Sequence, residues 1–100
     1  MYKRQLETTE ARGRLYRSTS SRGHAADVLR RSTRDELSSH LRLPPAEVGV
    51  LVRDVAARLD RPTADIDALI GERAAAPATD DELIRLATAL AELDREVRRT

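Results

Sequence analysis

The sequence predicts an all-α fold, a small bundle of four to five helices with a short helical corner. Apolar residues make up 40% of the 100 residues, and the only aromatic ones are two tyrosines. A core of leucine, valine, isoleucine and alanine suits helix packing, whereas sheets usually contain more β-branched and aromatic residues. These apolar residues also recur at spacings of three and four, which is the helical period.

The first two helices are predicted at residues 6–17 and 21–41, with a break at the small polar residues 18–23. The face of the first helix consists of Leu6, Thr9, Gly13 and Tyr16. The apolar stripe of the second consists of Ala26, Leu29, Thr33, Leu37 and Leu41. Five charged residues are expected to lie largely off that stripe: Arg30, Arg31, Arg34, Asp35 and Glu36.

The third and fourth helices are predicted to form the corner. Pro44 and Pro45 end the preceding helix, because proline has no N–H and disfavours helical geometry in the residue before it. The third helix covers residues 45–59, and its buried face consists of Val48, Leu51, Val52, Val55, Ala56 and Leu59. Thr63 is expected to cap a short fourth helix that ends at Gly71. The apolar residues of this fourth helix are Ile66, Leu69 and Ile70.

The last helix follows a connector at residues 74–78. Thr79 and Glu82 have the spacing of a capping box, in which each side chain binds a backbone N–H at the helix start. Its apolar stripe consists of Leu83, Leu86, Ala87, Leu90, Leu93 and Val97. Arg98 and Arg99 lie at the C-terminal end, where positive charge is favourable.

Residues 55–66 have the spacing of a helix-turn-helix, with Ala56 and Ile66 at packing positions. A DNA-binding regulator is therefore the alternative function, and its candidate DNA contacts are Arg61, Thr63 and Arg73. However, Asp60 replaces the usual glycine of the turn, and several carboxylates would enter a groove walled by phosphates. We therefore expect a packing corner and no nucleic-acid partner.

The sequence contains no pattern that predicts an enzyme. His24 and His40 lie sixteen residues apart, and the chain has no cysteine to complete a metal site. The carboxylate clusters lie at predicted helix starts, where the helix dipole accounts for them. We therefore predict no catalytic residue, no metal, no cofactor and no small-molecule substrate.

Positive charge is concentrated in residues 1–45, whose net charge is +5, whereas residues 46–100 have a net charge of −4. One basic band consists of Arg12, Arg14, Arg17 and Arg22. A solvated helix face accounts for such a band, and so does the cytoplasmic flank of a membrane-spanning helix, which collects Lys and Arg. No apolar run of the chain itself reaches the ~18 residues that span a bilayer, so we expect the chain by itself to be soluble.

Residues 1–5 differ in composition from the rest of the chain. Lys3 is the only lysine and Gln5 the only glutamine, and residues 2–5 resemble a translated transposase adapter used in preparing DNA libraries. We therefore expect residues 1–5 to be non-native. Residues 6–100 are expected to form a single helical domain, the C-terminal part of a longer protein.

Residues 6–17, 24–26, 41–44, 80–83 and 93–97 carry a family resemblance. They resemble the cytosolic C-terminal region of actinobacterial membrane proteins of the domain-of-unknown-function 4350 family. The resemblance implies two transmembrane helices around an extracytoplasmic domain, in a protein typically encoded beside a MoxR-type AAA ATPase and a protein with a von Willebrand factor A-like region. It transfers no catalytic residue.

Together, the residues and the resemblance predict a non-enzymatic interaction module on the cytoplasmic side of the cell membrane. Its expected partner is a protein, with the neighbouring MoxR-type ATPase system as the candidate. N-terminal anchors would attach it to the membrane, and the basic band would lie next to the lipid.

Overall fold

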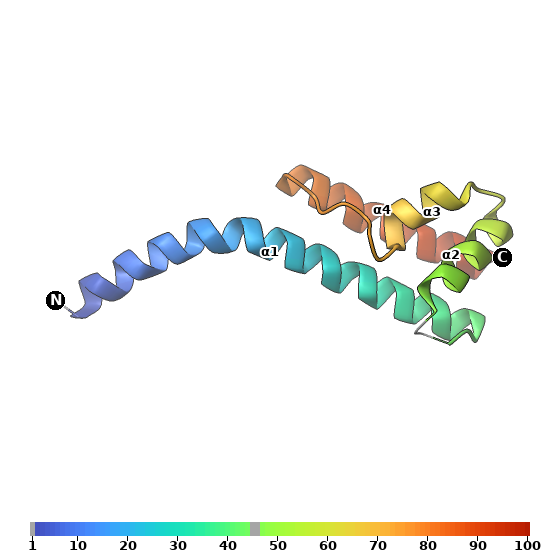
Figure 1. The fold of residues 1–100 in the computed structure, drawn as a ribbon, viewed down its shortest axis with the longest axis horizontal. Coiled ribbons are helices and arrows are strands. Elements are labelled where there is room, and N and C mark those ends of the chain that lie inside the picture. The colour runs from blue at the N-terminus through green and yellow to red at the C-terminus, as the bar shows by residue number, and fades with distance from the viewer. Residues whose placement is uncertain (1, 45–46) are drawn as a thin grey trace.

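The computed structural model describes the backbone of residues 2–44 and 47–100 and the side chains of residues 21–44 and 47–100. All regular structure in these residues is helical, which confirms the predicted all-α bundle. The four helices are α1 (Tyr2–Leu41), α2 (Val48–Leu59), α3 (Thr63–Ile70) and α4 (Asp80–Arg99). The N-terminal half of α1 extends beyond the other three helices, and its C-terminal half packs with them (Figure 1).

The predicted break at residues 18–23 is wrong, because α1 is one helix of 40 residues. Serine, threonine and glycine each cost at most about 1 kcal/mol relative to alanine, and none of them removes a backbone N–H as proline does. Adding one residue to an existing helix is also far easier than nucleating a new one. The backbone of residues 2–5 continues the same helix. Their non-native origin stays a prediction.

The C-terminal half of α1 and α4 run side by side in the same direction (Figure 1). Two ion pairs join their corresponding ends. Arg22 Nη1 lies 3.0 Å from Asp80 Oδ1 at the start of α4, and Arg98 Nη2 lies 3.9 Å from Glu36 Oε2 near its end. Asp80 in the first pair and both side chains of the second pair are exposed, so the pairs contribute little stability and mainly mark the alignment of the two helices.

The core lies where α2 and α3 cross the paired helices α1 and α4. Its buried apolar residues are Ala26, Leu37, Leu51, Val52, Val55, Ala56, Ile66, Ile70, Leu86, Leu90, Leu93 and Val97. Every one of them belongs to an apolar stripe that the spacing predicted. Each helix thus contributes one face to a shared core, which confirms the helical period read from the sequence.

The helical corner between α2 and α3 depends on Asp60. This residue has a φ of 52° and a ψ of 48°, the left-handed conformation that usually favours glycine. Aspartate is among the side chains that adopt this conformation most readily, so the missing glycine does not prevent the turn. Pro62 precedes the first residue of α3, and Thr63 makes no capping hydrogen bond. The predicted Thr63 cap is therefore wrong, because the helix begins at Thr63 itself.

Gly71 ends α3, as predicted, but for a different physical reason. Its φ of −67° and ψ of 157° are open to any residue, so no left-handed backbone is required. Instead, a Cβ atom at position 71 would collide with the backbone and side chain of Asp67. Glycine at this position therefore lets the chain turn closely against the last turn of α3.

The capping box at the start of α4 is present in a shifted form. Thr79 Oγ1 accepts a hydrogen bond from the Glu82 N–H at 3.1 Å. The Glu82 carboxylate reaches back one residue further than the standard motif, and Oε2 accepts from the Ala78 N–H at 2.6 Å. Two N–H groups that the helix itself cannot pair are thereby satisfied.

Replacing Thr79 by alanine is expected to lower the free energy of unfolding by about 1 kcal/mol, because the Glu82 N–H loses its acceptor. Urea unfolding followed by circular dichroism measures this change. Thr88, which is exposed in the middle of α4, is the matched control. Thr88→Ala is expected to leave stability unchanged or slightly higher, since alanine favours helix. Equal losses in the two variants would contradict the capping role.

Candidate functional site

Two arginines of α1 bind the C-terminal end of α3. Arg30 is only 6% exposed, and its Nε donates a hydrogen bond to the Leu69 carbonyl at 2.9 Å. Its Nη2 lies 3.5 Å from the Ala68 carbonyl oxygen. Arg34 Nη1 donates to the Ile70 carbonyl at 3.0 Å. These are carbonyls of the last turn of α3, where a helix has unpaired acceptors and the negative end of its dipole.

Burial lowers the pKa of Arg30, the carboxylate of Asp27 raises it, and the positive charge of Arg34 lowers it. Burial is the largest of the three effects. Arginine side chains are not deprotonated in proteins, so the guanidinium keeps its positive charge despite this burial. A permanent positive charge is thus held against the end of α3 and is balanced in part by Asp27.

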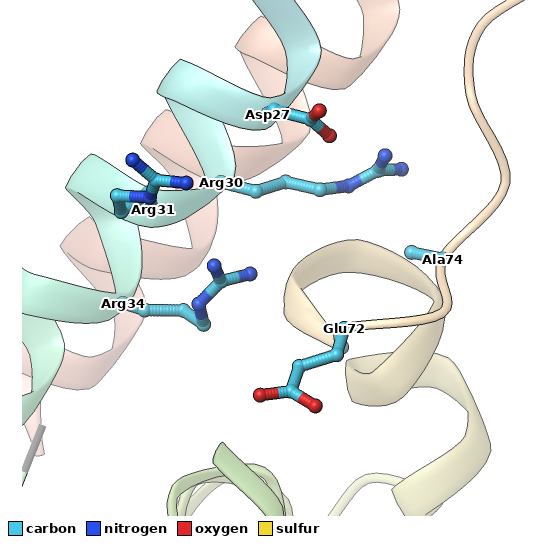
Figure 2. Close-up of a pocket in the computed structure, with 7 residues that line it drawn as sticks. Asp27, Arg30, Arg31, Arg34, Glu72 and Ala74 are labelled. Atoms are coloured by element: carbon cyan, nitrogen blue, oxygen red, sulfur yellow. The ribbon is translucent and has the colours of Figure 1, made fainter. Parts of the chain in front are cut away.

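A polar cleft of about 220 Å³ lies between α1 and the segment that follows α3. Arg30 and Arg34 project from α1 toward that segment, and Glu72 lies on the opposite wall (Figure 2). The residues lining the cleft are Asp27, Arg30, Arg31, Arg34, Gly71, Glu72 and Ala74. Guanidinium groups only donate hydrogen bonds, so the chemistry offered by the arginines is the binding of an anion.

The ionisable side chains that line the cleft are arginines and carboxylates. None of its lining side chains is a serine, threonine, cysteine, histidine or lysine, so it offers no hydroxyl, thiol, imidazole or amine nucleophile. Among the residues that the structure describes, no three His, Cys, Asp or Glu side chains are grouped so that they could hold a metal ion. His24 and His40 are both exposed, and His40 lies in the last turn of α1. The guanidinium donors of the cleft can bind and orient a negatively charged group.

The predicted basic band follows α1. The backbone of Arg12, Arg14 and Arg17 belongs to the part of α1 that projects beyond the bundle, and their side chains lie outside the described residues. Arg22 lies at the edge of the bundle, where it pairs with Asp80 and is only partly exposed. Arg22 therefore contacts the bundle, and the membrane-proximal role of the band stays a prediction.

The candidate DNA contacts do not form one basic surface. Arg61 Nη1 lies 3.6 Å from Glu96 Oε2, so its charge is already paired with α4. Thr63 is exposed at the start of α3, and Arg73 is exposed in the segment that follows the end of this helix. Asp65 and Asp67 are exposed on the same helix, and their negative charge opposes the approach of phosphates. The geometry does not favour DNA recognition.

Sequence reasoning missed the role of Arg30 and Arg34. Both were expected to lie largely off the apolar stripe, yet Arg30 is buried among its residues. The available signal was the spacing, because Arg30 follows Ala26 by four residues and precedes Leu37 by seven, which places all three on one helix face. The residue type instead predicted that Arg30 is exposed to solvent, since arginine is almost never fully buried unless it is paired.

Fold and site together define a helical bundle with an arginine-lined polar cleft. The chain is 40% identical over 96 residues to the uncharacterized membrane protein Rv3691 of Mycobacterium tuberculosis. That match covers 94% of this chain and 24% of the relative, so the chain spans about a quarter of the relative's length. The similarity agrees with the predicted resemblance to a region of a membrane protein.

No family model matches the chain, and no solved structure matches it. Within the part of the chain that the structure describes, none of the helices combines the length and the apolar character needed to cross a membrane.

Proposed function

We propose that this chain is a non-enzymatic interaction module of a membrane protein, that it lies on the cytoplasmic side, and that it docks a MoxR-type AAA ATPase. The observation that carries the proposal is the 40% identity to one quarter of a membrane protein. Membrane anchors would lie in the part of the full-length protein outside this match. The ATPase is proposed as the partner because of the family resemblance of residues 6–17, 24–26, 41–44, 80–83 and 93–97.

The shape of α1 supports an attached module. The N-terminal half of α1, a helix of 40 residues, projects beyond the bundle (Figure 1). At about 1.5 Å per residue, this half extends roughly 30 Å. Such a segment would hold the bundle away from a bilayer, with Arg12, Arg14 and Arg17 along the segment nearest the membrane. Anionic lipids of the cytoplasmic leaflet attract basic residues in this position. The bundle itself would then be free to contact a protein in the cytosol.

The docking proposal is tested by titrating the purified chain into the MoxR-type ATPase from the same genome, in isothermal titration calorimetry near physiological salt. We expect saturable binding with a Kd of about 10 μM or tighter. The chain alone should not hydrolyse ATP. Absence of any heat of binding at concentrations of about 100 μM would contradict the proposal.

A duplex DNA titration separates the docking module from the DNA-binding alternative. Binding to phosphates releases counterions, so DNA binding would weaken steeply between low and physiological salt. We expect no measurable DNA binding at physiological salt. Tight, salt-sensitive DNA binding together with no binding to the ATPase would favour the DNA regulator.

A further inference from the structure

The arginines of the cleft retain hydrogen-bond donors that the fold does not use. Each guanidinium has five N–H donors. Arg30 uses Nε and Nη2 on α3, and Arg34 uses Nη1. Arg31 is exposed on the same wall and makes no hydrogen bond with the residues that the structure describes. The cleft therefore presents unused donors from three positive groups.

Two of these groups are also fixed in place. The Leu69 and Ile70 carbonyls hold Arg30 and Arg34 against α3, so their long side chains have already lost most of their rotamer freedom. A ligand that binds them loses less conformational entropy than it would on free surface arginines. The fold thus prepares the cleft to bind an anion.

The charge and volume of the cleft select a ligand with one negative charge. Asp27 and Glu72 offset two of the three arginines, which leaves the lining with a net charge of +1. A carboxylate matches this balance and can accept two parallel N–H bonds from one guanidinium. A phosphate with two negative charges would exceed the net charge of +1 and would be repelled by both lining carboxylates. A volume of about 220 Å³ accommodates the end of one acidic side chain.

We infer that this cleft binds one aspartate or glutamate side chain from an acidic segment of the partner protein. The inference rests on the proposed function as a protein-docking module and specifies the chemistry of its contact. Arg31 would supply the exposed donors that reach the incoming carboxylate, while Arg30 and Arg34 would form the rigid floor.

A synthetic peptide tests this inference directly. The probe is an acetylated and amidated ten-residue peptide with two adjacent glutamates at its centre, and the comparison peptide has glutamines in their place. Binding to the purified chain is followed by amide chemical shifts in NMR. We expect the glutamate peptide to shift residues 27–34 and 71–74, and the glutamine peptide to bind at least about tenfold more weakly.

Two arginine variants make the test specific. Arg31→Met is expected to weaken binding of the glutamate peptide about tenfold or more, because charged hydrogen bonds are lost. Arg85→Met removes an exposed arginine of α4 that does not line the cleft, and it should leave binding within about twofold. Equal binding of the two peptides, or equal effects of the two variants, would overturn the inference. Stronger shifts at these residues with inorganic phosphate than with the glutamate peptide would also overturn it.

The ATPase titration distinguishes failure of the cleft from failure of the proposed partner. If the glutamate peptide binds through Arg31 while the ATPase does not bind, the cleft assignment stands and the ATPase is the wrong partner. If the ATPase binds the wild type and Arg31→Met equally and the peptide does not bind, docking stands and the cleft assignment is wrong.

Discussion

Replacing Leu37 by alanine is expected to lower the free energy of unfolding by about 3–5 kcal/mol. Leu37 is 0% exposed and lies in the core that all four helices share. Removing a fully buried leucine side chain loses its transfer free energy and leaves a cavity that helices can only partly fill. Domains of this size have a total stability of only about 5–15 kcal/mol, so this single change removes a large part of it.

Thermal and urea unfolding followed by circular dichroism at 222 nm measure this loss. The melting temperature should fall by at least ~10 °C, given roughly 4–8 °C for each kcal/mol in a domain of this length. Val28→Ala is the matched control on the same helix, because Val28 is 49% exposed. It should change stability by less than about 0.5 kcal/mol. Similar losses in both variants would show that α1 does not pack as described.

Replacing Arg30 by methionine is expected to lower the free energy of unfolding by on the order of 2–3 kcal/mol. Methionine keeps the length and most of the apolar contact of the side chain but removes its donors. The Leu69 and Ala68 carbonyls would then face a buried side chain that cannot bind them. Removing the buried charge of Arg30 also removes its desolvation penalty, which offsets part of this loss of stability. The loss from carbonyl acceptors left without a donor is larger than this gain.

Arg31→Met is the control for Arg30→Met, because it removes the same charge one residue further along an exposed face. Its effect on unfolding should stay within about 0.5 kcal/mol. The difference between the two variants in urea unfolding isolates the contacts with α3 from the general effect of charge. If Arg30→Met proved as stable as Arg31→Met, the bonds to α3 would contribute nothing to the fold.

The periodic apolar residues allowed most of the fold to be predicted from sequence. The stripe from Leu83 to Val97 and the capping pair Thr79 and Glu82 lie where their spacing predicted. The reason is local, because a helix face and an N-terminal cap depend on residues a few positions apart. The corner was predictable for the same reason, since prolines and polar residues limit α2 and α3 to short segments.

The predicted break in the first helix and the predicted Thr63 cap were wrong because the neighbouring structure outweighed the local residue preference. Residues 18–23 contain weak helix formers, but they continue a helix that is already formed on both sides. Thr63 is a good capping residue by type, yet Pro62 occupies the capping position. Neither outcome follows from the residue types alone, because each depends on where the neighbouring element begins.

The spacing could have indicated that Arg30 faces the core, but the contacts of Arg30 and Arg34 with α3 could not be predicted, because these parts are far apart in the chain. Arg30 binds carbonyls 38 and 39 residues away, and a backbone carbonyl leaves no mark in the sequence. The basic character of α1 was visible, but not which arginines would serve the fold and which would face solvent. Because α1 packs against α3, Arg30 and Arg34 contact the end of α3, whereas Arg31 faces solvent.

The proposed docking requires a folded helical module, and not merely a charged segment. One measurement tests this directly, using Leu37→Ala, which has the same length and net charge as the wild type. At a temperature between the two unfolding midpoints, the MoxR-type ATPase is titrated with each chain. We predict that the folded wild type binds and that the unfolded variant binds at least about tenfold more weakly. Equal binding of both chains would contradict the claim.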